Sequence, residues 1–284
     1  MSRIVYVNGE YLPEEEAKIS VFDRGFLFAD GVYEVSTVVD GRLVDNAAHL
    51  ARLRRSLDEL DMAAPATPEE IEAIQREMIA RNGVEEGLVY LQVTRGAADR
   101  DFLYPKDALP SLVMFTQTKN VIDNPAATTG ISVITLPDIR WRRRDIKTVG
   151  LLAASMAKQA AQEAGADDAW MVEDGLITEG SSNNAFIVTH EGAIVTRALS
   201  NDILHGITRR AVLAIAEREG LTVEERAFSP EEAHEAAEAF ITSASTFVMP
   251  VVKIDNRILG NGVPGPVTQD LRRLYIEMAR NEAS

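Results

Sequence analysis

The strongest constraint on the fold is the way the first half of the chain alternates short strand-like runs with two helical segments. Residues 4–8 read as a strand, and Asn8-Gly9 is typical of a tight hairpin turn. A β-branched, alternating run over 32–39 ends at Asp40-Gly41, a second hairpin signal.

The two helical segments are separate from the strands. Leucines recur every three or four residues between Leu50 and Leu60, which predicts a helix over 47–62. Thr67 before Pro68 predicts the start of a second helix over 68–80. Further strands are predicted at 42–44, 88–94, 112–117, 131–136, 169–172, 185–189, 193–196, 240–242 and 248–254, and further helices at 151–164, 206–219 and 267–279.

Mixed strands with segregated helices predict an α+β fold in two halves. The polar, proline-containing stretch 119–129 interrupts the strand pattern and marks the boundary. We therefore expect a small N-terminal α/β domain over 1–119, a linker over 120–126, and a larger C-terminal domain over 127–284.

Composition excludes several classes of function. The formal net charge of −15 disfavours nucleic acid and anionic membranes as partners. The 284 residues include no cysteine, which removes disulfides and thiolate chemistry, and the four histidines are too scattered to predict a metal site. The N-terminus lacks a signal-like apolar stretch, so we expect a cytoplasmic protein.

Lys147 ends the segment RWRRRDIK, in which five of eight residues are basic. A solvated basic run is one interpretation, and nucleic-acid binding fits poorly with an acidic chain that has no second basic patch. The alternative is that nearby guanidinium groups lower the pKa of Lys147 and attract anions. A lysine of that kind attacks aldehydes and moves protons.

Glu179 lies in TEGSSNN, a stretch of small and hydrogen-bonding residues between two strand-like runs. A polar hairpin turn would account for part of this pattern. The functional alternative is a carboxylate that faces a pyridine nitrogen and keeps it protonated, which turns the ring into an electron sink.

The segment LHGITR, residues 204–209, opens a helix. The first N–H groups of a helix are unpaired and attract anions, and Gly206 permits close approach of a ligand to the backbone. A simple glycine-containing cap is the other interpretation. No dinucleotide-binding or P-loop motif occurs.

The N-terminal half adds weaker signals. An aromatic-rich loop, DRGFLFADGVYE, leads into the strand that carries Tyr33, and His49 and Arg52 share one helix face. Arg100 is predicted on a loop after a strand. Taken singly, each of these is typical of an ordinary surface or capping residue.

Together, the motifs DRGFLFADGVYE, the lysine after RWRRRDI, TEGSSNNAF and LHGITR resemble the fold-type IV pyridoxal-phosphate enzymes over nearly the whole chain. Among these the chain is most similar to D-amino acid aminotransferases. The resemblance implies a two-domain α+β fold whose C-terminal domain is β-barrel-like with helices. It also implies pyridoxal 5′-phosphate as cofactor, an amino acid and a 2-keto acid as substrates, and a homodimer.

The resemblance also implies roles for individual residues. Lys147 forms the Schiff base and moves the substrate α-proton, and Glu179 faces the pyridine nitrogen. Arg52 binds the phosphate, and Arg100 of the partner subunit holds the substrate carboxylate. The implied cofactor-binding residues are Arg52, Lys147, Glu179, Ser182, Asn183, Leu204, Gly206, Ile207, Thr208, Ser243 and Ala244, and the implied substrate-binding residues are Tyr33, Val35, His49, Arg100 and Phe102.

Two positions depart from the family pattern. Phe102 stands where the D-amino acid enzymes have a histidine two residues after the arginine, which removes a charge-assisted contact to the substrate carboxylate. Ala244 replaces a threonine that binds phosphate, and Ser243 or Ser245 would have to supply the hydroxyl.

The function expected from the sequence is transfer of the amino group of a D-amino acid, such as D-alanine or D-glutamate, to a 2-keto acid. Aminodeoxychorismate lyase and L-branched-chain aminotransferase are alternatives within the family. A non-catalytic, anion-binding dimer is the alternative from another class.

Overall fold

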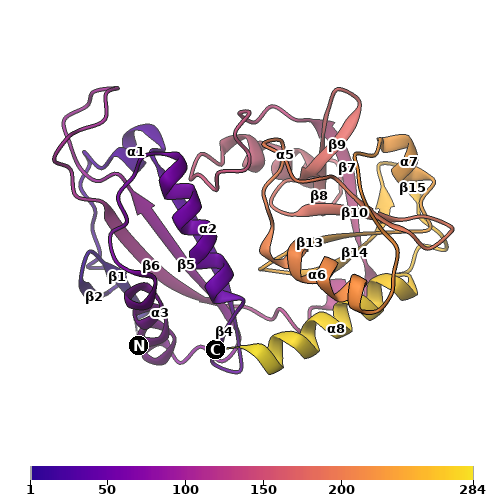
Figure 1. Cartoon of the computed structure of the whole chain (residues 1–284), viewed down its shortest axis with the longest axis horizontal. Helices are drawn as coiled ribbons and strands as arrows, with labels where there is room; N and C mark the ends of the chain where they lie inside the picture. Colours follow the sequence, from indigo (N-terminus) through magenta and orange to yellow (C-terminus); the bar gives the residue numbers. More distant parts are fainter. Residues whose placement is uncertain (1, 284) are drawn as a thin grey trace. The chain divides into compact units, whose positions relative to one another are not determined.

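The computed structural model describes residues 2–283, which divide into two compact units (Figure 1). The first unit comprises residues 2–120, 146–150 and 279–283, and the second comprises 121–145 and 151–278. Lys147 therefore belongs to the first unit, whereas the arginines just before it belong to the second. Sequence patterns place a boundary near residue 120 but give no sign that 146–150 packs with the N-terminal unit.

A six-stranded antiparallel sheet, in the order β2-β1-β6-β5-β3-β4, is the framework of the first unit. Its strands are β1 (Ile4–Val7), β2 (Glu10–Pro13), β3 (Gly31–Val39), β4 (Arg42–Val44), β5 (Gly87–Thr94) and β6 (Ser111–Thr118). The predicted turns at Asn8-Gly9 and Asp40-Gly41 join β1 to β2 and β3 to β4. All four residues have positive φ, from 48° to 105°. Asparagine, aspartate and glycine adopt such angles at low cost, so both hairpin predictions are confirmed.

The helices of this unit are α1 (Arg24–Phe28), α2 (Asn46–Glu59) and α3 (Pro68–Asn82). The predicted leucines of α2 are buried in the unit's main apolar cluster together with Leu91 and Met114 of the sheet. Thr67 and Glu70 form a reciprocal capping box at the start of α3. The prediction of a loop over α1 is wrong, because Asp23 accepts a hydrogen bond from Gly25 N at 2.8 Å and starts a short helix.

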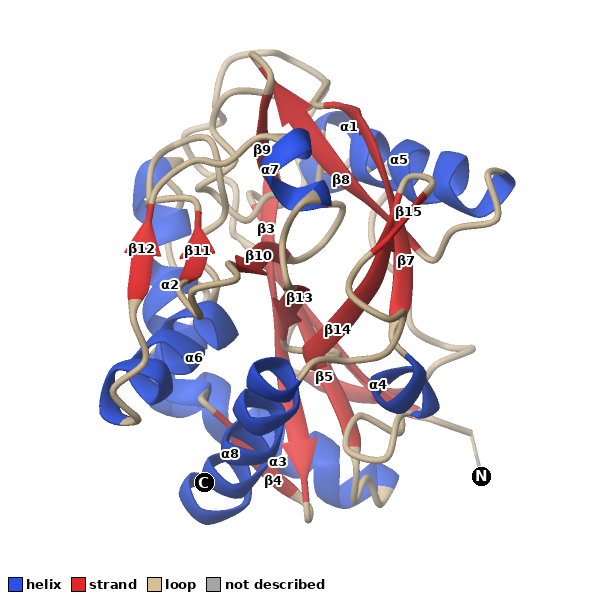
Figure 2. Cartoon of the chain, turned by 90° about the vertical axis from the view of Figure 1, so that its right-hand side faces the viewer, coloured by secondary structure: helices blue, strands red, loops and turns tan. Residues whose placement is uncertain are grey.

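The second unit is built on a mixed sheet of nine strands, in the order β12-β11-β10-β13-β14-β7-β8-β9, with β15 paired to β14. The pairs β14–β7, β7–β8 and β11–β12 are parallel and the others antiparallel. Figure 2 shows β13, β14 and β7 side by side in this sheet. Its strands are β7 (Ile131–Pro137), β8 (Asp168–Glu173), β9 (Leu176–Gly180), β10 (Asn184–Val188), β11 (Ile194–Thr196), β12 (Val223–Glu225), β13 (Glu238–Ser243), β14 (Phe247–Ile254) and β15 (Arg257–Ile258).

The remaining helices are α4 (Pro125–Thr129), α5 (Leu152–Glu163), α6 (Ile207–Arg218), α7 (Pro230–His234) and α8 (Pro266–Glu282). Helix α5 packs on β7 and β8, and α6 on β13 and β14. Helix α4 overlaps the predicted linker, because Asn124 caps a turn that begins at Pro125. The core contains Trp170 packed edge-on against Phe228.

The α+β prediction is confirmed: both units combine a sheet with helices on its faces. None of the helices within residues 2–283 is both long and apolar enough to cross a lipid bilayer.

Candidate active site

Strand β3 presents two different chemistries because successive side chains point to opposite faces of a strand. Tyr33 lies on one face, where its ring contacts Lys147 and Tyr90. Glu34 lies on the other, where its carboxylate contacts helix α2. One strand therefore positions both functional features of the first unit.

Lys147 is fixed through its backbone to this strand. Tyr33 N donates a hydrogen bond to Lys147 O at 3.0 Å, and Val32 forms an isolated bridge with Thr148. The Lys147 amine lies 4.2 Å from the centroid of the Tyr33 ring. At this distance the π-face attracts an ammonium group, so the tyrosine orients the flexible lysine side chain.

The Tyr33 ring is the end of a stacked series of aromatic rings. It stacks on Tyr90 with centroids 5.6 Å apart, and Tyr90 stacks on Phe115 at 4.6 Å. Burial raises the pKa of Tyr90 to about 12, with a further contribution from Tyr33, so its hydroxyl stays protonated. That hydroxyl donates to Gln92 at 2.8 Å. The result is a neutral, rigid support beneath the lysine.

On the opposite face, Glu34 is completely buried between Arg52 and His49. Arg52 contacts it with two nitrogens, each at 2.7 Å, and His49 Nδ1 lies 2.8 Å from its Oε2. Burial acts to raise the pKa of Glu34, but the Arg52 guanidinium, assisted by His49, lowers it to about 2. Burial also lowers the pKa of His49, so the ring is neutral at pH 7 and donates its Nδ1–H to the carboxylate.

Sequence reasoning placed Arg52 and His49 on one helix face, and they lie on one face of α2. It assigned Arg52 to a phosphate and His49 to the substrate, but it did not single out Glu34, which joins the two. The other predicted substrate residues differ in exposure: Val35 is half-buried, whereas Arg100 and Phe102 are exposed on the loop between β5 and β6.

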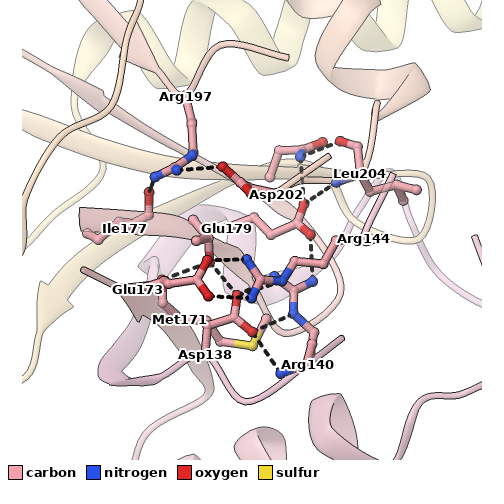
Figure 3. Close-up of polar contacts among 12 residues, drawn as sticks. Asp138, Arg140, Arg144, Met171, Glu173, Ile177, Glu179, Arg197, Asp202 and Leu204 are labelled. Carbon is pink, nitrogen blue, oxygen red and sulfur yellow. Dashed lines mark hydrogen bonds and ion pairs between the residues drawn. The ribbon is translucent and has the colours of Figure 1, made fainter. Parts of the chain in front are cut away.

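In the second unit, Glu179 lies in strand β9 and not in a turn. Figure 3 shows its carboxylate at the centre of a polar network. Arg140 Nη1 donates to Oε1 at 2.6 Å, and Leu204 N donates to Oε2 at 3.0 Å. Burial raises the pKa of Glu179, and the Arg140 guanidinium opposes this rise. Glu179 is thus a buried carboxylate that a further positive charge would stabilise.

The basic run before Lys147 is largely paired with carboxylates of its own unit (Figure 3). Arg140 makes two hydrogen bonds to Asp138, at 3.0 and 2.7 Å, in addition to its contact with Glu179. Arg144 contacts Glu173 at 2.7 Å, and Arg143 contacts Asp145 at 3.0 Å. The sequence suggested that these guanidinium groups act on the lysine. The structure instead assigns Arg140 to Glu179.

Asn184 is a central residue that sequence reasoning missed. Its Nδ2 donates to Glu179 Oε2 at 2.9 Å and to Leu204 O at 3.0 Å. A Cβ at Gly206 would lie 2.0 Å from Asn184 Oδ1, so only glycine fits there. Asn184 also pairs with Thr242 of β13. The side chain of Asn184 therefore joins Glu179 to the segment before α6, while its backbone belongs to the strand that pairs with β13.

Two features of the second unit suit an anion. Helix α6 begins after Gly206, which supplies no side-chain cap, so its first N–H groups have no partner of that kind. Near the predicted Ala244, the hydroxyls of Ser243 and Thr246 lie 2.8 Å apart, and that of Ser245 lies 3.3 Å from Ser243. Hydroxyls are thus present beside the alanine that replaces the family's threonine.

Ser182 and Asn183, both predicted near the cofactor ring, have different surroundings. Ser182 is exposed, whereas Asn183 is buried and its Nδ2 donates to Asp168 at 2.9 Å. Ser181, which was not predicted, also donates to Asp168, at 2.5 Å. Asp168 thus fixes the turn that follows Glu179.

The sequence of the chain is similar to those of known proteins. A model of the amino-transferase class IV family matches residues 31–254. A D-alanine aminotransferase of Bacillus licheniformis is 39% identical over 270 residues, with 94% of each chain covered. One of Staphylococcus haemolyticus is 36% identical over 285 residues, with 99% of each chain covered.

Solved structures agree on the fold. The Escherichia coli branched-chain amino acid aminotransferase has a TM-score of 0.92 at 21% identity, with 100% of this chain and 97% of that chain covered. A T.th. branched-chain enzyme, solved with pyridoxamine 5′-phosphate, has a TM-score of 0.91 at 28% identity, with 99% and 95% covered. From the match over residues 31–254 and the nearly full-length relatives, the chain belongs to the class IV aminotransferase family.

Proposed function

We propose that this protein is a pyridoxal-phosphate-dependent aminotransferase that moves the amino group of a D-amino acid, such as D-alanine or D-glutamate, to a 2-keto acid. The observation that carries the proposal is the 39% identity, over 94% of both chains, to a D-alanine aminotransferase. The chemistry of each unit supports it independently.

The second unit offers groups that suit the ring nitrogen and the phosphate of this cofactor. Glu179 is a buried carboxylate, and burial raises its pKa. A protonated ring nitrogen beside it would lower that pKa again and so stabilise the charged carboxylate. The start of α6, at Ile207 and Thr208, supplies N–H donors for the phosphate, and the hydroxyl of Ser243 or Ser245 supplements them. Leu204, whose backbone contacts Glu179, would pack on the ring face.

The first unit offers an amine and a guanidinium. Lys147 would hold the cofactor through its amine, which the Tyr33 ring orients at 4.2 Å. Arg52, held by Glu34, would contribute positive charge to the phosphate. The donor sets of both units therefore fit pyridoxal phosphate.

When bound, the cofactor supplies an aldehyde that accepts the amino group and a ring that delocalises the electrons of the broken Cα–H bond. The chain does the rest. Lys147 takes the α-proton and returns it at a different carbon, which is general acid–base catalysis. Glu179 keeps the ring nitrogen protonated, and Asn184 and Arg140 keep that carboxylate in place.

The substrate carboxylate is assigned to Arg100 of a second copy of the chain, and the protein to a homodimer. Several large apolar side chains of the first unit are exposed, including Phe22, Leu103 and Leu109. Such a group favours burial against another protein surface. Cytoplasmic localisation stays a prediction.

The test is an absorbance spectrum of the purified protein, with D-alanine, L-alanine and L-leucine added to separate samples. A visible cofactor band that changes with D-alanine alone supports the proposal. A change with L-leucine instead would favour the branched-chain alternative, to which the solved structures belong. Pyruvate released from aminodeoxychorismate without a keto acid would favour the lyase. No band after addition of pyridoxal phosphate would refute the proposal.

Lys147→Ala provides the matched variant. It should lose turnover and the covalent, borohydride-fixed cofactor while its unfolding curve stays close to wild type. Turnover at the wild-type rate would remove Lys147 from the site.

A further inference from the structure

Phe102 stands two residues after Arg100, the predicted carboxylate-binding residue, at a position where the D-amino acid enzymes have a histidine. The guanidinium carbon of Arg100 lies 5.6 Å from the centroid of the Phe102 ring and 5.3 Å from that of Phe28. The two rings are 5.5 Å apart and inclined at 57°. The cation therefore contacts two aromatic rings, one from its own loop and one from helix α1.

The loop that carries Arg100 is attached to the body of the first unit. Arg24 Nη1 donates to Asp101 O at 2.6 Å, and its Nε donates to Asp30 at 2.7 Å. On the other side of Phe102, Arg24 Nη1 donates to Leu103 O at 3.4 Å, and the guanidinium carbon of Arg95 lies 3.6 Å from the centroid of the Tyr104 ring. The backbone on either side of Phe102 is thus anchored, although its ring is 79% exposed.

The three arginines around this loop differ in charge balance. Arg24 and Arg95 share the carboxylate of Asp30. Within residues 2–283, Arg100 makes no ion pair, even though Asp99 and Asp101 flank it in the sequence. Its positive charge is thus unpaired in the described part of the chain, where Phe28 and Phe102 are its cation–π partners.

Aromatic contact has a specific consequence for a guanidinium group. A ring covers the flat face of the group and leaves the N–H donors, which lie in its plane, open for a bidentate contact with a carboxylate. An aromatic neighbour also limits the rotamers of a long side chain that would otherwise be ordered only on binding.

We propose that Phe28 and Phe102 are positioning residues that hold the Arg100 guanidinium for the α-carboxylate of the substrate. This inference rests on the proposed function. Phe102 then does more than remove the hydrogen-bond donor of a histidine. It orients Arg100, and this orientation takes the place of the second contact to the carboxylate. Phe28, to which the sequence assigned no role, becomes a determinant of carboxylate recognition.

The test compares Phe28→Leu and Phe102→Leu with Phe26→Leu. Phe26 is a matched control because it lies on the same helix, is 70% exposed, and has no ring contact with a guanidinium among residues 2–283. Steady-state kinetics with D-alanine would be measured at saturating keto acid, alongside the rate at which a simple primary amine without a carboxylate alters the cofactor band. Cofactor content and oligomeric state would be checked for each variant.

Phe102→Leu should raise the KM for D-alanine about 2- to 5-fold, the range expected from one cation–π contact, with kcat changed less. Phe28→Leu should raise KM at least as much, because the Phe28 ring also lies 4.6 Å from the guanidinium carbon of Arg24, which holds the loop. The rate with the amine should match the control. Phe102→Tyr, which keeps a π-face, should restore KM to within about 2-fold of wild type.

Three results would overturn the inference. The KM values of the test variants could equal that of Phe26→Leu, the losses could be as large for the amine as for D-alanine, or Phe102→Tyr could be as impaired as Phe102→Leu. Each is measured in an enzyme that still transaminates, so each leaves the proposed function standing. A wild-type protein that converts no D-amino acid would instead refute both proposals.

Discussion

Each unit contains a buried glutamate paired with an arginine, and the two pairs differ in how completely the carboxylate is neutralised. Glu34 receives two hydrogen bonds from Arg52 and one from His49. Glu179 receives one from Arg140 and two from neutral donors, Asn184 and Leu204. The pKa of Glu34 falls to about 2, whereas burial raises that of Glu179 above its usual value.

The difference arises from how the arginine is shared. Both nitrogens of Arg52 that contact Glu34 serve this one carboxylate. Arg140 divides its donors between Glu179 and Asp138, and Asp138 also repels the Glu179 charge. The two pairs therefore differ in charge balance. The negative charge of Glu34 is balanced by Arg52, which holds helix α2 against β3. The negative charge of Glu179 is balanced less completely, so a positively charged ligand would stabilise it.

The largest expected effect is on stability in the first unit. Glu34→Ala leaves the buried Arg52 guanidinium without the carboxylate that it contacts through two nitrogens. The free energy of unfolding should fall by about 3–5 kcal/mol in urea titrations. Glu179→Ala should cost less because Arg140 keeps Asp138. Equal losses for the two variants would contradict the distinction between the pairs.

The second expected effect is on catalysis. Glu179→Gln removes the carboxylate charge but keeps a side chain of the same shape. The kcat with D-alanine should fall by about 100- to 1,000-fold, the cost of losing one preorganised electrostatic contact. The unfolding midpoint should move little. A kcat within a factor of about two of wild type would show that the ring nitrogen does not depend on this residue.

The third expected effect is on the pH dependence of stability. The pKa of Glu34 is about 2 in the folded protein against a reference of 4.5. Its stabilisation is therefore fully present above pH 4.5, is lost as the pH falls toward 2, and amounts to about 3 kcal/mol. The unfolding free energy of the wild type should fall more steeply between about pH 5 and 3 than that of Glu34→Gln. If the two plots of unfolding free energy against pH were parallel, the lowered pKa of Glu34 would be contradicted. Glu179, whose pKa is raised, should contribute with the opposite sign.

The smallest expected effect comes from a site remote from both pairs. Thr67→Ala removes the side-chain acceptor of the capping box at the start of α3. It should cost about 1 kcal/mol in unfolding free energy and leave kcat unchanged. Thr67→Ala thus measures the stability that one local hydrogen bond contributes. If it cost as much unfolding free energy as Glu34→Ala, the buried Glu34–Arg52 pair would contribute no more than such a local contact.

Local signals in the sequence predicted most elements of the fold. The turn at Asn8-Gly9, the leucine spacing of α2 and the cap at Thr67 depend on residues near each other in the chain. Helix α1 was missed because one capping aspartate, Asp23, starts a helix of only five residues. A helix of this length is too short to show a repeating spacing of apolar residues, so its sequence is typical of a loop.

The partners of the predicted site residues could not be found in the same way. Glu34 and Arg52 are 18 positions apart, and Arg140 and Glu179 are 39 apart. No period links such pairs, because strand pairing and helix packing decide which side chains meet. Asn184 illustrates the limit: in the sequence it is one of two adjacent asparagines, and only the fold gives Asn184 the partner Glu179 and Asn183 the partner Asp168.

The alternation of Tyr33 and Glu34 along β3 makes two separate contacts depend on the register of one strand. A slip of this strand by one residue would exchange its two faces, so that the lysine lost its aromatic support and Arg52 lost its carboxylate together. Because both contacts depend on one strand register, a substitution that shifts β3 should remove them together, and on the proposed function the amine and the guanidinium that hold the cofactor would be lost in one step.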